Sequence, residues 1–284
     1  MFIDVKKVGV VGAGTMGNGI AQVCAAAGLE VVMLDLDQAA LERGVATVAG
    51  SLGRMVQKGK LDEATRESTL ARITTTTDYA DLAEIDLVIE AASEIESVKL
   101  AIIRTLDEVV GKNAIIATNT SSISITRLAA ASSTPNRFIG LHFFNPVPVM
   151  LLVEVIRGLQ TDDATYNTAV DFVETIKKTS ISVKNSAGFA VNRILVPMIN
   201  EAVFVLQEGI ASAQDIDNGM RLGCNHVIGP LALADLIGLD TLLAVMEVFY
   251  SSFSDSKYRP APLLREMVEA GYLGRKSGQG FYSY

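Results

Sequence analysis

Short apolar segments alternate with longer amphipathic ones along the first 185 residues of the chain. Residues 7–12 (KVGVVG) form an apolar run that predicts a buried strand, and apolar side chains recur at helical spacing in residues 15–28. Further strands are expected at 30–35, 86–91, 114–119 and 138–143, and further helices at 38–58, 94–110 and 123–131. Strands that alternate with helices predict an α/β fold with a mostly parallel sheet covered on both faces.

The pattern changes in the second part of the chain. Two last strands, at 150–156 and 180–183, flank a helix at 162–177, and every later segment has helical periodicity. Residues 188–208 are apolar on nearly all sides, which is typical of a helix buried in a core or in a subunit interface. We therefore expect a sheet domain over residues 1–185 and an all-helical domain over residues 186–284.

Composition narrows the classes of function. The formal net charge is −8, which disfavours a nucleic-acid partner because phosphate contacts need clustered Lys and Arg. No uncharged apolar run reaches the roughly 18 residues of a membrane span, and the first residues lack the features of a secretory signal. Cys24 and Cys224 lie in different halves of the chain, which suits a reducing compartment. A cytoplasmic protein that does not bind membranes is expected.

A glycine-rich motif, GAGTMG, occupies residues 12–17 between the first strand and the first helix. Its glycines would allow a tight turn, close approach of a pyrophosphate, and close packing of helix on strand, as in Rossmann-like domains. Asp35 follows at the end of the second strand, where a carboxylate would accept the ribose hydroxyls and repel the 2′-phosphate of NADP. NAD is therefore the expected cofactor, and the motif residues expected to contact it are Gly12, Gly14, Thr15, Met16 and Gly17.

His142 is one of two histidines and lies near the carboxyl end of a predicted strand, where open α/β sheets place their ligands. A histidine suits proton transfer near neutral pH because its ordinary pKa is about 6.5. The residues alone leave catalysis and core packing equally plausible. Glu154 interrupts an apolar strand, which is costly unless the carboxylate is paired, and His142 is a natural partner.

Two further polar sites accompany this pair. Residues 119–122 (NTSS) follow the strand at 114–119, so a hydroxyl there could bond a substrate carbonyl, while Ser122 or Ser124 could instead cap the next helix. Asn192 lies early in the most apolar helix, and a buried amide there requires a partner in either the core or a site.

Several motifs together resemble the L-3-hydroxyacyl-CoA dehydrogenase family over the whole chain, in particular its bacterial 3-hydroxybutyryl-CoA enzymes. They are GAGTMG, EAASE, NTSS, GLHFFNPVPVM, LVEVI, GFAVNR and GRKSGQGFYSY, in this order. GLHFFNP and GFAVNR are far more specific than the glycine motif. The resemblance implies an NAD-dependent dehydrogenase of acyl-CoA substrates, with a Rossmann-like domain and a helical domain that binds substrate and forms a homodimer.

The resemblance also assigns roles to residues of this chain. It makes His142 the acid/base, pairs it with Glu154, and completes the catalytic and substrate site with Ser121 and Asn192. Two positions, Leu151 and Ala190, depart from the family pattern beside site residues and leave the shape of the substrate pocket open. Beyond the glycine motif and Asp35, the expected cofactor contacts are Glu94, Lys99, Asn119, Asn145 and Lys276.

An anionic coenzyme A needs local positive charge on this acidic chain. Arg54 and Lys58 are four residues apart on a predicted helix and so share one face, and Lys60 follows in the next turn. The resemblance makes Arg54 and Lys58 the expected contacts of the CoA phosphates, although a solvated surface face explains them too. Two rival functions remain open: a dehydrogenase of free hydroxy or sugar acids, and a non-enzymatic NAD-binding structural protein.

Overall fold

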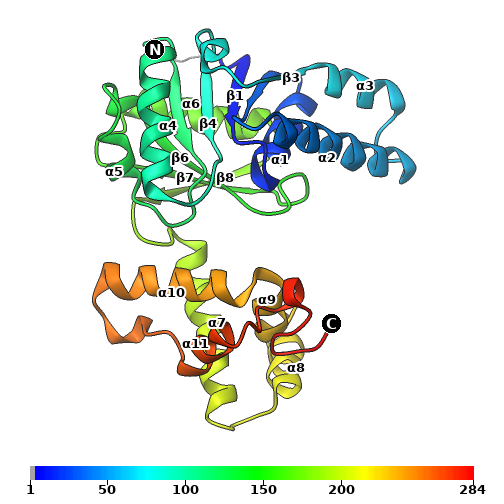
Figure 1. Ribbon diagram of the computed structural model, residues 1–284, viewed down its shortest axis with the longest axis vertical. Helices are drawn as coiled ribbons and strands as arrows, with labels where there is room; N and C mark the ends of the chain where they lie inside the picture. The colour runs from blue at the N-terminus through cyan, green and yellow to red at the C-terminus, as the bar shows by residue number, and fades with distance from the viewer. Residues whose placement is uncertain (1–3) are drawn as a thin grey trace. The chain divides into compact units, whose positions relative to one another are not determined.

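The structure, a computed structural model, describes residues 4–284. These residues form two compact units, one ending at Ser186 and the other comprising Ala187–Tyr284. Figure 1 traces the first unit in blue to green and the second in yellow to red.

The first unit is built on an eight-stranded sheet in the order β3-β2-β1-β4-β5-β6-β7-β8. All neighbouring strands are parallel except β6 and β7, which are antiparallel. The crossover between β1 and β4 creates a switch point, outside which ligands bind in open sheets of this kind. The strands are β1 (Lys7–Val11), β2 (Glu30–Leu34), β3 (Ile73–Thr76), β4 (Leu87–Glu90), β5 (Ile115–Thr118), β6 (Phe138–Phe143), β7 (Leu152–Arg157) and β8 (Thr179–Lys184).

Helices of the first unit begin where polar residues cap them. The side chains of Asp37, Asp62, Ser124 and Asp162 each accept a backbone N–H of the first turn of their helix. Ser124, rather than Ser122, is therefore the cap after the NTSS turn. The helices are α1 (Thr15–Ala26), α2 (Gln38–Gln57), α3 (Glu63–Ala71), α4 (Glu96–Val109), α5 (Ile125–Ala129) and α6 (Asp163–Thr175), with short 3-10 helices η1 (Tyr79–Leu82) and η2 (Pro135–Arg137).

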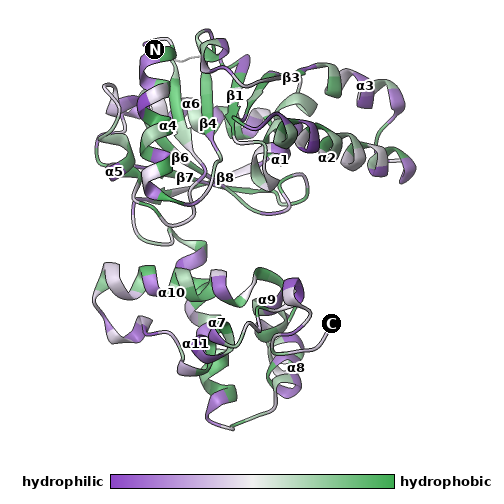
Figure 2. Cartoon of the chain, viewed as in Figure 1, coloured by the Kyte–Doolittle hydropathy of each residue, from purple (hydrophilic) through white to green (hydrophobic). Residues whose placement is uncertain are grey.

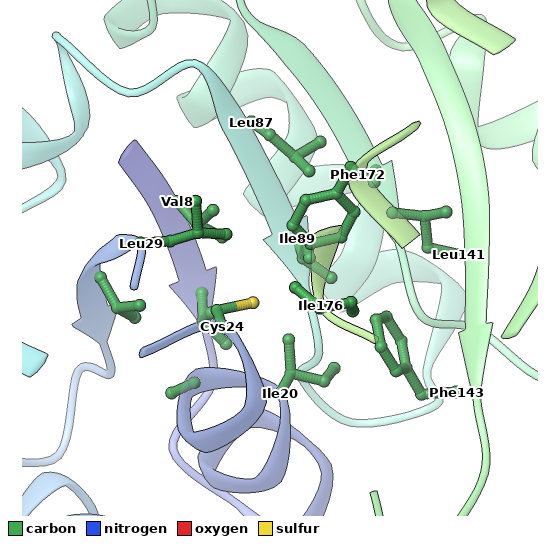
Figure 3. Close-up of a cluster of buried hydrophobic side chains, with 14 of the residues drawn as sticks. Val8, Ile20, Cys24, Leu29, Leu87, Ile89, Leu141, Phe143, Phe172 and Ile176 are labelled. Carbon is green, nitrogen blue, oxygen red and sulfur yellow. The ribbon is translucent and has the colours of Figure 1, made fainter. Parts of the chain in front are cut away.

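One core cluster of the first unit lies between the sheet and the helices α1, α2 and α6. Figure 3 shows Ile20 and Cys24 of α1 and Phe172 of α6 in one cluster with strand side chains such as Val8 and Ile89. Alternate strand residues point to the opposite face, where Gly140 of β6 has no side chain and Ile125 of α5 fills the space. Strands β4, β5 and β6 are buried on both faces, as their apolar runs predicted, and most of the sheet is hydrophobic in Figure 2.

The second unit is helical, with a core of its own around Val203, Leu239, Met246 and Phe249. Its last residues form no long helix but fold back on α9, where the Asp235 carboxylate accepts the N–H groups of Phe281 and Tyr282. The elements are α7 (Val191–Gln207), α8 (Ala213–Gly223), α9 (Pro230–Ile237), α10 (Leu239–Phe253) and α11 (Pro262–Glu269), with η3 (Ser256–Tyr258) and η4 (Arg275–Ser277).

The expected fold class, a mostly parallel Rossmann-like sheet domain followed by a helical domain, is confirmed. The sequence patterns missed α3 and the edge strand β3, which lie between the second predicted helix and the third predicted strand. Within residues 4–284, no helix combines the length and the apolar composition needed to cross a membrane.

Candidate active site

The glycine-rich turn between β1 and α1 uses each glycine for a different reason. Gly12 has a φ of +105°, and a Cβ there would lie 2.7 Å from the Ala91 carbonyl oxygen. A Cβ on Gly17 would lie 1.7 Å from the Gly12 carbonyl oxygen, so only glycine lets α1 start this close to β1. A Cβ on Gly14 would meet nothing within 4 Å, which leaves the backbone open to an approaching phosphate.

Asp35, just after β2, lies beside this turn. Its carboxylate accepts the Ala13 N–H at 2.8 Å and the Asp37 N–H at 3.1 Å, which fixes its orientation. A pocket of about 490 Å³ opens next to it, lined mostly by apolar residues that include Leu36, Tyr79 and Val98. An open phosphate turn, an oriented carboxylate and a flat apolar pocket suit the pyrophosphate, ribose and adenine of a dinucleotide. The sequence patterns did not identify the residues of this pocket.

His142 and Glu154 face each other across the antiparallel strands β6 and β7. They are directly opposite in the register, and His142 Nδ1 lies 2.7 Å from a Glu154 carboxylate oxygen. Glu154 has no exposed surface and His142 only 6%. A buried carboxylate this close to Nδ1 fixes the orientation of the ring. The arrangement can therefore exchange a proton through Nε2.

The NTSS turn after β5 is organised around a single carboxylate oxygen. Glu94 accepts the Ser121 N–H at 2.8 Å and the Ser122 N–H at 3.0 Å, and it accepts the hydroxyls of Thr120, Ser121 and Ser122. Burial favours a higher pKa for Glu94, but the charge of Lys99 and these hydrogen bonds outweigh it and lower the pKa. Glu94 is thus a carboxylate that shapes the segment containing Ser121.

Lys99, on α4, is only 1% exposed and lies beneath that turn. Its ammonium donates to both carboxylate oxygens of Glu90, at 2.8 and 2.9 Å, and lies 3.5 Å from Glu94. Glu90, fully buried at the end of β4, also accepts the Thr118 hydroxyl of β5 at 2.6 Å. Glu90 was not predicted as a site residue, although a glutamate that ends the apolar run LVIE was a usable signal.

Two asparagines lie at this edge of the sheet, and one of them connects its strands. The side-chain oxygen of Asn119 accepts the Phe143 N–H at 2.9 Å, which ties the end of β5 to β6 beside His142. Asn145 follows β6, is exposed, and precedes Pro146 in a cis peptide bond. The structure thus gathers Asn119, Ser121 and His142 at the carboxyl ends of adjacent strands.

The basic residues predicted on α2 line a second pocket, of about 570 Å³. Arg54, Lys58 and Lys60 are all exposed, and the pocket is completed by residues of α1 and of the segment 145–149. The pocket therefore places positive charge beside Asn145. Such a surface suits an anionic group.

Asn192 and Lys276 belong to the second unit. Asn192 is the second residue of α7, and Lys276 forms an ion pair with Asp240 at 2.5 Å. Neither residue belongs to the compact unit that contains the sheet and His142, so their predicted roles remain predictions. In residues 4–284, no three His, Cys, Asp or Glu side chains cluster in a way that could hold a metal ion.

Comparison with known proteins places these features in a family. Residues 7–186 match the family model for the NAD-binding domain of 3-hydroxyacyl-CoA dehydrogenase, and residues 188–284 match the model for its C-terminal domain. The chain is 52% identical over its full length to a 3-hydroxybutyryl-CoA dehydrogenase of Bradyrhizobium diazoefficiens, covering 97% of that relative. It is 48% identical to one of Clostridioides difficile, covering 98% of this chain and 99% of the relative.

Solved structures give the same result. The crystal structure of (S)-3-hydroxybutyryl-CoA dehydrogenase from Ralstonia eutropha superposes with a TM-score of 0.97 at 63% identity, covering 99% of each chain. The predicted resemblance is confirmed, and so is the expectation of an NAD cofactor, because the matched sheet domain is an NAD-binding one. The chain belongs to the 3-hydroxyacyl-CoA dehydrogenase family.

Proposed function

We propose that the chain interconverts (S)-3-hydroxybutyryl-CoA and acetoacetyl-CoA as an NAD-dependent dehydrogenase. The observation that carries this proposal is the buried His142–Glu154 pair at the carboxyl edge of a dinucleotide-binding sheet, with 2.7 Å between Nδ1 and the carboxylate. The names of the full-length relatives, which are 3-hydroxybutyryl-CoA dehydrogenases, support this substrate over other hydroxy acids.

NAD(H), when bound, supplies or accepts the hydride. In the reducing direction, His142 donates its Nε2 proton to the 3-oxygen of the substrate, which becomes a hydroxyl as the 3-carbon gains the hydride. Glu154 keeps Nδ1 protonated and stabilises the imidazolium that precedes transfer. In the oxidising direction, neutral His142 takes the hydroxyl proton.

Ser121 and Asn192 are proposed to hold the 3-oxygen and the thioester end of the substrate. Ser121 sits in the turn that Glu94 fixes, so its hydroxyl has a defined position before substrate arrives. Preorganised hydrogen-bond partners of this kind stabilise charge that develops during reaction without a further cost of reorganisation. The role of Asn192 rests on the family motif GFAVNR alone.

The cofactor would lie along the glycine turn and Asp35, whose charge favours NAD over NADP. Asn119, Asn145 and Glu94 are proposed to line its nicotinamide end. Lys99 is enclosed by two glutamates, so we propose that it acts on the cofactor only through Glu94. Lys276 is proposed as a contact from the second unit.

Arg54 and Lys58 are proposed to bind the phosphates of coenzyme A. Both are exposed in one pocket, beside Lys60, so a charge reversal there need not disturb the core. Lys58→Glu should raise KM for acetoacetyl-CoA by about tenfold, because one attractive contact becomes repulsive, and should leave the Kd of NADH unchanged. Steady-state kinetics and NADH fluorescence titration measure both, and an unchanged KM would contradict the assignment.

Spectrophotometric NADH oxidation separates the proposed function from its rivals. Acetoacetyl-CoA should be reduced far faster than free acetoacetate or other free keto acids. Faster turnover of a free acid would favour the rival class of hydroxy-acid dehydrogenases, and no turnover of any 3-ketoacyl-CoA would favour a non-enzymatic NAD-binding protein.

The second unit is proposed as the substrate-binding and dimerisation domain of a cytoplasmic homodimer, with the domain boundary near residue 186. Support comes from large apolar side chains that a single copy leaves exposed. These side chains are Ile194, Ile210, Leu222, Val227 and Leu236. Sedimentation equilibrium measures whether the protein is a dimer.

A further inference from the structure

One buried lysine has no role in the chemistry proposed above. Lys178 lies between α6 and β8 and is only 8% exposed. Its ammonium donates to the carbonyl oxygens of Val147, at 2.7 Å, and Met150, at 2.6 Å. Both partners are neutral main-chain groups about 30 residues away in sequence, so these contacts join two distant parts of the chain.

The two carbonyls belong to one short turn after β6. The Pro146 carbonyl accepts the N–H groups of Val149 and Met150, which closes the turn. Pro146 and Pro148 have no N–H to donate, so the turn has few internal donors. A lysine ammonium has three donors, and two of them bond carbonyls of this turn.

The inner side of this turn is fixed from two directions. The Val147 side chain is 2% exposed and belongs to the core cluster. It packs so closely on α1 that a Cβ on Gly19 would lie 2.9 Å from the Val147 Cβ. Lys178 then holds the main chain on both sides of Pro148 and Val149.

The outer side of the same turn lines the pocket that contains Arg54, Lys58 and Lys60. Residues 145–149 line it together with Arg54 and Lys58. Pro148 and Val149, the two residues between the carbonyls that Lys178 binds, are both exposed in that lining. The position of this wall relative to the basic residues therefore depends on an anchor that never reaches the pocket itself.

We infer that Lys178 is a positioning residue for the coenzyme A end of the substrate, because it anchors the wall formed by residues 145–149 in the pocket of Arg54 and Lys58. The inference rests on the proposed function. It assigns to Lys178 no contact with substrate and no part in proton transfer. Lys178 affects the binding of the nucleotide part of coenzyme A.

The test compares two substrates that differ only in that nucleotide part: acetoacetyl-CoA and the acetoacetyl thioester of pantetheine, which has no nucleotide and no phosphates. Lys178→Met keeps the length and apolar stem of the side chain but removes its donors. It should raise KM for acetoacetyl-CoA about tenfold, or about 1.4 kcal/mol, with little change in kcat. KM for the truncated thioester should stay at the wild-type value.

Lys177→Met is the matched control, because Lys177 is adjacent, equally charged and exposed; it should leave both KM values unchanged. Calorimetric titration of free coenzyme A gives a readout without turnover, and Lys178→Met should raise that Kd about tenfold. If Lys178→Met does not fold, Val147→Ala loosens the same turn from the core and should give the same substrate-selective rise in KM.

An equal rise in KM for both thioesters, or no rise for either, would overturn the inference while leaving the proposed function intact. Failure of the wild-type protein to turn over acetoacetyl-CoA would instead overturn the proposed function. The two failures are therefore distinguishable in one set of assays.

Discussion

Two fully buried glutamates of the same sheet, Glu154 on β7 and Glu90 on β4, are paired with bases in different ways. Glu154 pairs with His142 at 2.7 Å across neighbouring strands. Glu90 pairs with Lys99 of α4, and its carboxylate also accepts a hydroxyl from β5 and the Ala92 N–H. Burial and ion pairing are alike at the two positions, so neither property by itself identifies a catalytic group.

The partner makes the difference. Lys99 of α4 donates to both carboxylate oxygens of Glu90, so this pair fastens α4 to the sheet. A histidine gains and loses its proton near neutral pH. We therefore propose proton exchange with substrate for the Glu154–His142 pair and a structural role for Glu90–Lys99.

The largest expected effect concerns the histidine pair. Glu154→Gln should lower kcat by about 10²–10⁴-fold, because the amide no longer stabilises the imidazolium or fixes its tautomer. The Kd of NADH should stay unchanged. Glu174→Gln, at an exposed glutamate of α6, is the control and should have wild-type kinetics. A kcat close to that of the control would mean that the two buried pairs do not differ in function.

Lys99→Met should act mainly on stability. It leaves Glu90 as a buried charge without its partner, which costs about 3–5 kcal/mol in similar cases. The double variant Glu90→Gln/Lys99→Met removes both charges and should recover much of that loss. Urea denaturation followed by circular dichroism measures both, and a double variant less stable than Lys99→Met would contradict the view that the pair is structural.

A smaller expected effect concerns Glu94, which lies 3.5 Å from the Lys99 ammonium. The pKa of Glu94 lies below its ordinary value of 4.5 in the folded chain, since Lys99 and the hydrogen bonds of the NTSS turn outweigh the effect of burial. A carboxyl whose pKa is lower folded than unfolded stabilises the fold above its unfolded pKa and loses that contribution as pH falls through its folded pKa.

The stability difference between the wild type and Glu94→Gln should therefore be constant near pH 7 and shrink as pH falls below 4.5. Urea midpoints measured across this range provide the test. If this stability difference instead grew as the pH fell, the pKa of Glu94 would not be lowered in the folded chain.

Apolar periodicity predicted the strands that are buried on both faces, and it gave β6 its observed bounds, Phe138–Phe143. It missed β3, because an edge strand with the sequence ITTT contains a single apolar residue and pairs on one side only. Helix α3 has few apolar residues, and Thr69 is the one side chain that it buries. Neither element has the apolar periodicity from which the other helices and strands were predicted.

Some residues of the candidate site were likewise predictable from the sequence, and others were not. His142 and Glu154 were predictable because each interrupts an apolar strand with a side chain that needs a partner. Lys178 was not, because its acceptors are main-chain carbonyls about 30 residues away, which no side-chain pattern records. Tyr79 in the pocket beside Asp35 was missed for a related reason, since the 3-10 helix that carries it gave no periodic signal.

The most direct test of the central claim is the turnover of His142→Ala with acetoacetyl-CoA and NADH, alongside titration of NADH binding. If His142 transfers the proton, kcat should fall by at least about 10²-fold, and the Kd of NADH should match the wild type because the glycine turn and Asp35 are untouched. A kcat within about threefold of the wild type would contradict the role of His142 as the acid/base, since a general acid contributes far more than that.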